Sequence, residues 1–309
     1  MKRQFDEFNV NFLRLWDDLH EIVKKTLRVR QMLRGSLRDD IDNWVHDIFI
    51  CQLNFEEYRA HLAQKEDEGR FDKEFYSKLK PGEAIVIADW KMKILPMEYR
   101  ESQQKFFAKR GFSCLGFLVI TLSEDDPKKV NLHYHLYLSD DSTQDSDAVN
   151  EAKRDLYTKL NQMGILRVHY RADGAGCFSG ASAKGPIIHW HEWTGVTEAS
   201  YKISVAGCGK TMLDGLFGIF TMHIQQLVNE GGSYQNAEDL FCLLSDNPIS
   251  ATYIHVIKPD RTKTVSVGSK DLGHCYLIEC DIDNKNVIVK QHSRHGSGKA
   301  IAWDDLKVK

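Results

Sequence analysis

Long apolar segments are missing from this chain of 309 residues. The longest apolar runs, such as residues 84–88 and 117–120, are far shorter than the ~20 residues that a membrane helix needs. The first residues are charged and lead into no apolar stretch of signal-peptide length. We therefore expect an intracellular protein with no membrane span and no secretory leader.

Cysteine, proline and net charge are also scarce. Seven scattered Cys, an odd number, predict reduced thiols in the cytosol or nucleus rather than a disulfide framework. Six Pro and 42% hydrophobic residues exclude a low-complexity or disordered chain. A net charge of -3 gives no global basic field for nucleic acid. Such binding must be local, and the acid-free basic stretch at residues 24–38 is one candidate, with a solvated helix face as the alternative.

The first 80 residues have the period of amphipathic helices. Apolar side chains recur at three-to-four spacing from Phe8 to Val23 and again from Trp44 to Leu53. A charged stretch at residues 64–80 then ends in Pro81 and Gly82, which indicates a domain boundary. We predict a helical N-terminal region over residues 1–80.

After Pro81 the pattern changes to short β-branched runs separated by helical segments. The first run, 84–88, reads as a buried strand that ends on Asp89. Two strands, at 114–121 and 132–138, follow and form a meander with the first. After them we predict a helix at 148–163, a strand at 165–170, a helix at 182–193, a strand at 200–205 and a helix at 210–229. Short strands in residues 231–309 predict a small β-rich C-terminal region.

Three acids occupy special places in this order. Asp89 ends the first strand, Asp173 follows the fourth, and Asp214 lies in the first turns of the last helix. If the first and fourth strands are neighbours and that helix packs across them, the three carboxylates converge. Each acid alone is equally explained as a turn or helix-start residue. Together they predict a site for Mg²⁺ or Mn²⁺, because clustered anions need a cation and oxygen ligands favour these metals.

Four sequence elements carry a resemblance to a known family. They are Asp89-Trp90-Lys91-Met92-Lys93, Arg100-Glu101-Ser102-Gln103 with Lys109-Arg110-Gly111, Ala172-Asp173-Gly174-Ala175-Gly176-Cys177, and Gly209-Lys210-Thr211-Met212-Leu213-Asp214-Gly215. Over about residues 50–245 the chain resembles the RNase H-like DDE/D transposases of eukaryotic DNA transposons and proteins derived from them. The third acid is Asp, where Glu is commoner.

The resemblance implies a mixed α/β fold and a DNA-cutting chemistry. It implies an RNase H-like catalytic domain at residues 81–230, with Asp89, Asp173 and Asp214 holding two Mg²⁺ or Mn²⁺ ions for phosphoryl transfer. The implied partner is DNA, at transposon ends or target, in the nucleus, and a homo-oligomer is a further expectation. Lys210, one helical turn before Asp214, is a candidate phosphate contact. The alternative is a catalytically silent transposon-derived module that binds DNA or a protein partner.

A phosphate-binding loop is the main rival motif. Residues 204–211 end in Gly-Lys-Thr at a strand-to-helix junction, as in nucleotide hydrolases. The pattern requires Gly where this chain has Ser204, and no apolar strand ending in a suitable acid follows. The hydrolase therefore ranks behind the transposase.

Histidine, cysteine and tryptophan patterns suggest other sites. The close pairs are His133 with His135, and His189 with His191 near Cys208, although packed histidines explain such pairs as well. A zinc finger built from Cys275, Cys280, His292 and His295 has too short a second spacing and polar residues, Asn284 and Lys290, at its core positions. Zinc is thus only an alternative cofactor. Trp190 and Trp193 could stack on bases or belong to the core.

Overall fold

A computed structural model gives the fold for residues 2–30, 32, 34–107, 109–123, 126, 129–204, 212–263, 272–273, 275–291 and 297–306, with side chains from residue 14 onward except 29, 105 and 106. The chain divides into two compact units, Met1–Gln64 and Lys65–Lys309. The division falls inside a helix, before the Pro81 boundary expected from the sequence. In the described part, no helix is both long enough and apolar enough to cross a membrane.

The first unit is a helical hairpin, as the apolar period predicts. Helix α1 covers Lys2–Arg30 and helix α2 covers Ser36–Tyr76. A guanidinium N–H of Arg30 donates to the carboxylate of Asp42 at 2.6 Å and ties the two helices beside their connection. The last turns of α2 belong to the second unit.

The second unit is a mixed α/β structure built on one sheet. Its described strands have the order β6-β3-β2-β1-β4-β5-β7-β8-β9. Their bounds are β1 Glu83–Ile94, β2 Phe112–Leu122, β3 Val130–Ser139, β4 Arg167–Ala172, β5 Thr197–Ile203, β6 Thr252–Val256, β7 Leu277–Asp281, β8 Asn286–Lys290 and β9 Lys299–Ala302. The predicted meander is confirmed, because β1, β2 and β3 pair antiparallel, while β4 is parallel to β1 and β5 to β4.

The predicted C-terminal β region is divided between the two edges of this sheet. Strand β6 pairs parallel to β3, whereas β7 pairs antiparallel to β5 and continues into β8 and β9. Residues 264–271 of this predicted region lie outside the described residues.

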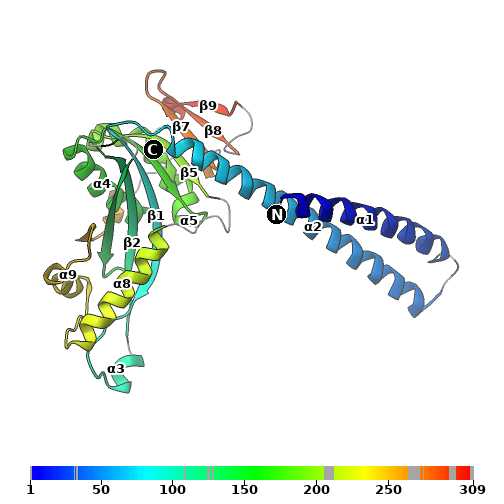
Figure 1. The fold of residues 1–309 in the computed structure, drawn as a ribbon, viewed down its shortest axis with the longest axis horizontal. Coiled ribbons are helices and arrows are strands. Elements are labelled where there is room, and N and C mark those ends of the chain that lie inside the picture. Colours follow the sequence, from blue (N-terminus) through cyan, green and yellow to red (C-terminus); the bar gives the residue numbers. More distant parts are fainter. Residues whose placement is uncertain are drawn as a thin grey trace. The chain divides into compact units, whose positions relative to one another are not determined.

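Helices cover both faces of the sheet (Figure 1). Helix α4, Ser146–Gln162, packs with Val86, Phe117 and Tyr170 on one face. Helix α8, Met212–Asn229, and helix α9, Ala237–Asp246, pack on the other face, where Ile85 and Ile87 of β1 lie. The remaining helical elements are short, at α3 Gln103–Phe107, α5 Gly176–Ser179, α6 Ala181–Lys184, η1 Gly185–Ile188, α7 Trp190–Thr194, η2 Arg261–Lys263 and η4 Trp303–Leu306.

Two local predictions were wrong. The helix expected at 182–193 is broken into α6, η1 and α7, because Pro186 lacks an N–H and cannot continue an α-helix. The first strand does not end at Asp89 but continues to Ile94, since β2 still pairs with it there. Only the parallel pairing to β4 stops, at Ala88 and Ala172.

Candidate functional site

Asp89 and Asp173 lie at equivalent places on neighbouring strands. In the parallel register, Ala88 of β1 is opposite Ala172 of β4, and each acid is the next residue. Side chains alternate along a strand, so Asp89 points to the same face as Ile85 and Ile87, which is the face covered by α8. The sequence-based expectation that these strands are neighbours is therefore confirmed.

Helix α8 brings Asp214 to the same face by packing on a glycine. Asp89 is opposite Gly116 of β2, and a Cβ on Gly116 would lie 2.7 Å from Cζ of Phe217 and 3.0 Å from Cδ1 of Leu213. Only the absence of a side chain allows this approach. The helix thus crosses β1 and β2, not β1 and β4 as expected, and Asp214 follows Leu213 in its first turn.

The charges of Asp173 and Asp214 act on Asp89. Burial, together with the smaller effects of the negative charges of Asp173 and Asp214, raises the pKa of Asp89 to about 6, against the opposing effect of the Trp90 backbone N–H. Within the described residues, Asp89 forms no ion pair with Lys or Arg. The site therefore concentrates negative charge on a half-buried carboxylate.

The carboxylate oxygens of the three acids are suitable ligands for a hard divalent cation, but the side chains are not arranged as a complete ligand set. Over the part of the chain with assigned positions, no three His, Cys, Asp or Glu side chains are close enough to hold a metal ion. The Oδ1 atom of Asp173 accepts a hydrogen bond from the Ala175 backbone N–H at 3.0 Å, the turn role considered from the sequence. Lys210 and residues 205–211 of the phosphate-loop motif lie outside the described residues.

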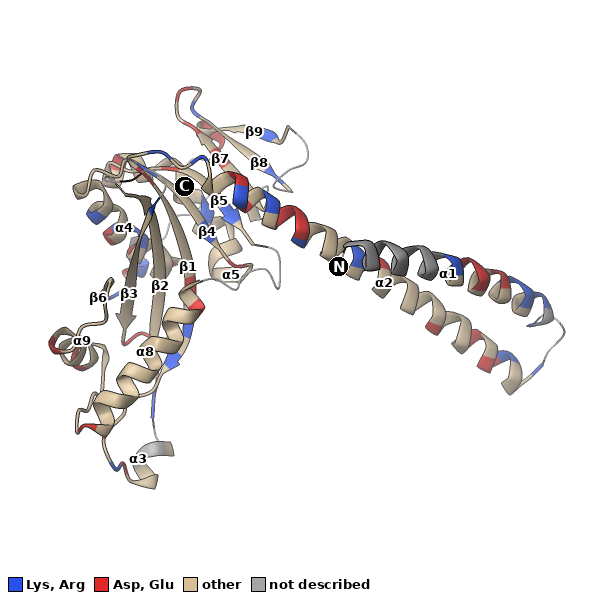
Figure 2. Cartoon of the chain, viewed as in Figure 1, with Lys and Arg blue, Asp and Glu red and all other residues tan. Residues whose placement is uncertain are grey.

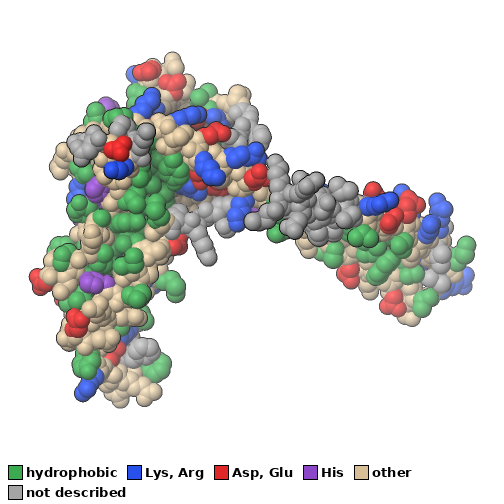
Figure 3. All heavy atoms as spheres, in the orientation of Figure 1, with side chains coloured by type: hydrophobic (Ala, Val, Ile, Leu, Met, Phe, Trp, Pro, Cys, Tyr) green, Lys and Arg blue, Asp and Glu red, His purple; other side chains and the backbone are tan. Residues whose placement is uncertain are grey.

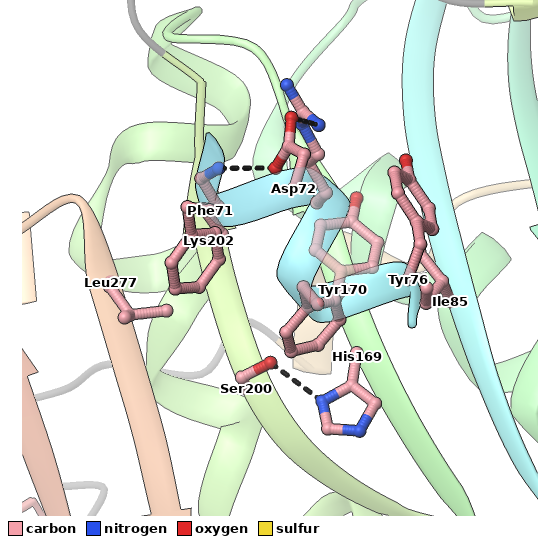
Figure 4. Close-up of a pocket in the computed structure, with 11 residues that line it drawn as sticks. Phe71, Asp72, Tyr76, Ile85, His169, Tyr170, Ser200, Lys202 and Leu277 are labelled. Carbon is pink, nitrogen blue, oxygen red and sulfur yellow. Dashed lines mark hydrogen bonds and ion pairs between the residues drawn. The ribbon is translucent and has the colours of Figure 1, made fainter. Parts of the chain in front are cut away.

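The sequence did not predict a network of charged side chains that lies beside the acids. Arg171 donates to Ser204 Oγ at 2.8 Å and to Glu68 Oε1 at 3.1 Å, and it also pairs with Asp72. Lys202 Nζ lies 2.7 Å from Asp72 Oδ1 (Figure 4). These bonds fix the last turns of α2 to β4 and β5. Arg171 lies two residues before Asp173.

The same contact encloses only a small pocket. Phe71 and Phe75 of α2 face His169, Ser200 and Leu277 around about 20 Å³, room for one water. This is packing rather than a ligand site. The four-residue spacing of Phe71 and Phe75 inside the charged stretch was the sequence signal for a buried helix face.

The histidine and tryptophan candidates are mostly packed. His135 Nδ1 and His255 Nε2 are 3.1 Å apart, and burial lowers the pKa of His135 to about 3 and that of His255 to about 4. Both rings are therefore neutral at pH 7. Trp190 is fully buried, so base stacking by Trp190 is excluded, and Trp193 stacks on His189.

The structure describes the two cysteines of the zinc-finger motif but not its two histidines. Cys275 is buried, and its thiol donates to the Leu272 carbonyl oxygen at 3.1 Å. His292, His295 and the Cys208 of the other pattern lie outside the described residues. Zinc stays an untested alternative.

Comparison with known proteins places the chain in a family. Residues 68–272, which include Asp89, Asp173 and Asp214, match the family described as a domain of unknown function, DUF8701. No curated protein and no solved structure gives a significant match. Because the matched segment covers more than half of the 309 residues, the chain belongs to the DUF8701 family.

Proposed function

We propose that the chain is an RNase H-like, transposase-type enzyme that cuts and joins DNA with divalent metal ions held by Asp89, Asp173 and Asp214. The strand order β3-β2-β1-β4-β5, with an antiparallel meander followed by parallel strands, supports the fold assignment. The resemblance of the sequence elements around the three acids supports the chemistry.

One observation carries this proposal. Asp89 is half-buried, and burial together with the charges of two acids distant in sequence raises its pKa to about 6. The charges of Asp173 and Asp214 disfavour the ionised form of Asp89, a cost in free energy that a bound cation would remove. Perturbed carboxylates of this kind cluster at functional sites.

The acids would act as oxygen donors on one face of the sheet. Asp89 of β1 and Asp173, the residue after β4, would hold the ions, and Asp214 would complete the ligand set from α8. Bound ions would activate water or a 3′-hydroxyl and stabilise the leaving oxygen. Arg171 would keep the end of β4 in place through Glu68, Asp72 and Ser204.

The direct test is metal-dependent nicking or joining of DNA by the full chain. Asp89→Asn should reduce the rate by on the order of 10²- to 10³-fold, as loss of a charge-stabilising group does. Asp246→Asn, an exposed acid at the end of α9, is the matched control and should leave the rate unchanged. Full activity in Asp89→Asn would refute the assignment.

A catalytically silent module is the second candidate, favoured by the turn hydrogen bond that Asp173 already makes. It predicts DNA or partner binding with no turnover in Mg²⁺ or Mn²⁺. Sustained cleavage by the purified protein, abolished in Asp89→Asn, would exclude it.

A further inference from the structure

The N-terminal hairpin leaves a row of large side chains uncovered on each helix. They recur every seven residues, at Leu15 and Ile22 on α1 and at Leu37, Trp44, Cys51 and Tyr58 on α2. The apolar residues among them are between 42% and 67% exposed. Charged residues three positions further on flank the row, at Asp18, Lys25, Asp40 and Asp47. Figure 3 shows apolar side chains reaching the surface along this hairpin.

A different set of residues holds the hairpin together. Trp16, Leu19 and Val23 of α1, with Val45 and Ile48 of α2, are half-buried. On both helices, residues of the exposed row come one position before residues of this set: Leu15 before Trp16, Ile22 before Val23, and Trp44 before Val45. Because the helices run in opposite directions, the same offset places both rows on one side of the hairpin.

This second apolar face is larger than an isolated hairpin needs. A helix with one partner requires a single stripe, whereas a helix in a four-helix bundle presents a wider apolar face to two neighbours. Six uncovered side chains at about 100 Å² each give about 600 Å² per copy, or about 1,200 Å² for two copies, the lower end of stable specific interfaces. The face is therefore large enough for a dimer.

We propose that this face binds a second copy of the chain, so that two hairpins form a four-helix bundle. A second copy supplies rows of the same length and the same seven-residue period, which side chains need to interlock. The charges of α1 also fit its own copy. The helix is acidic at Asp17, Asp18 and Glu21 and basic at Lys24, Lys25 and Arg28, so antiparallel contact near Ile22 brings opposite charges together. Figure 2 shows both signs along the hairpin.

The oligomeric state of the full chain tests this dimer. Sedimentation or light scattering at micromolar concentration should give the mass of two 35.5 kDa chains. Leu37→Glu with Trp44→Glu places carboxylates in the row and should weaken self-association at least 100-fold. The control, His46→Glu with Ala60→Glu, adds the same charge to exposed α2 positions on the opposite side of the helix from the row and should remain dimeric. Circular dichroism confirms that both variants keep their helices.

Thiol labelling gives a second readout that needs no variant. Cys51 lies in the row, whereas Cys242 is an exposed thiol on α9. As protein concentration rises, labelling of Cys51 should slow at least tenfold while labelling of Cys242 keeps its rate. A monomeric parent protein, or an unchanged dimer in Leu37→Glu with Trp44→Glu, would overturn the proposal.

Discussion

The two faces of the sheet hold buried charge in opposite ways. On the α4 face, Lys153 and Glu198 are completely buried and their charged groups are 2.6 Å apart. The Tyr157 hydroxyl donates to Glu198, and aromatic rings surround the ammonium, with the Tyr170 ring centre 4.1 Å from Nζ. On the α8 face, Asp89 is half-buried and meets the like charges of Asp173 and Asp214.

The difference separates a structural cluster from a candidate site. The buried Lys153–Glu198 pair contains its own counter-charge and is stabilised further by the Tyr157 hydroxyl and the surrounding rings. A carboxylate whose neighbours raise its pKa is incomplete and gains from a cation brought by solvent or substrate. We therefore assign Lys153 and Glu198 to the stability of the fold and Asp89 to function.

The largest expected effect on stability comes from removing one partner of the Lys153–Glu198 pair. Lys153→Met leaves the Glu198 carboxylate buried without its cation, which should lower the free energy of unfolding by about 3–5 kcal/mol. Urea denaturation measures the loss. Adding Glu198→Gln removes the stranded charge and keeps an acceptor for Tyr157, so the double variant should recover at least half of it. No recovery would mean that packing, rather than charge, makes the pair important.

A smaller effect should follow from a side chain on Gly116. Its Cβ would meet Phe217 at 2.7 Å, so Gly116→Val should cost about 1–3 kcal/mol of stability. By pushing α8 away, it should also lower the pKa of Asp89, which NMR titration can follow. The control is Gly218→Ala on α8, where a Cβ meets nothing within 4 Å. It should stabilise by about 0.5–1 kcal/mol, and equal effects at both glycines would contradict the packing argument.

The smallest effect concerns the stability cost of Asp89 itself. Its pKa is about 6 in the fold and about 3.9 in the unfolded chain. The folded state therefore binds more protons between these values, and its stability falls as pH rises from about 4 to 6. Because Asp89 is partly exposed and screened by solvent, Asp89→Asn should gain only about 1 kcal/mol at pH 8 and nothing below pH 4. Denaturation at both pH values measures this, and a loss at pH 8 would contradict it.

Much of the sheet and the position of the acids follow from the sequence. The β-branched runs and their order predict the β1-β2-β3 meander, and the acids fall at places that parallel pairing brings together. Local pattern could not predict that β1 continues to Ile94, because β2 pairing sustains it past the polar residues. Nor could it show that α8 crosses β1 and β2, since this depends on the missing side chain at Gly116.

Charged residues were the hardest to place. The stretch containing Glu68 and Asp72 has the composition of a linker, yet Arg171 and Lys202, both distant in sequence, bury it against the sheet. Lys153 gave a clearer signal, because it shares the apolar stripe of α4 with Val149, Leu156 and Leu160. A lysine on such a stripe predicts a buried partner, although the sequence does not say that the partner is Glu198.

The central claim is that the three acids form a cation site, and Mn²⁺ titration by calorimetry at pH 7.5 tests it most directly. The full chain should bind Mn²⁺, Asp89→Asn should lose at least tenfold in affinity, and Asp246→Asn should bind as the parent does. Equal affinity in the parent and in Asp89→Asn, or no binding to the parent at millimolar Mn²⁺, would contradict the account.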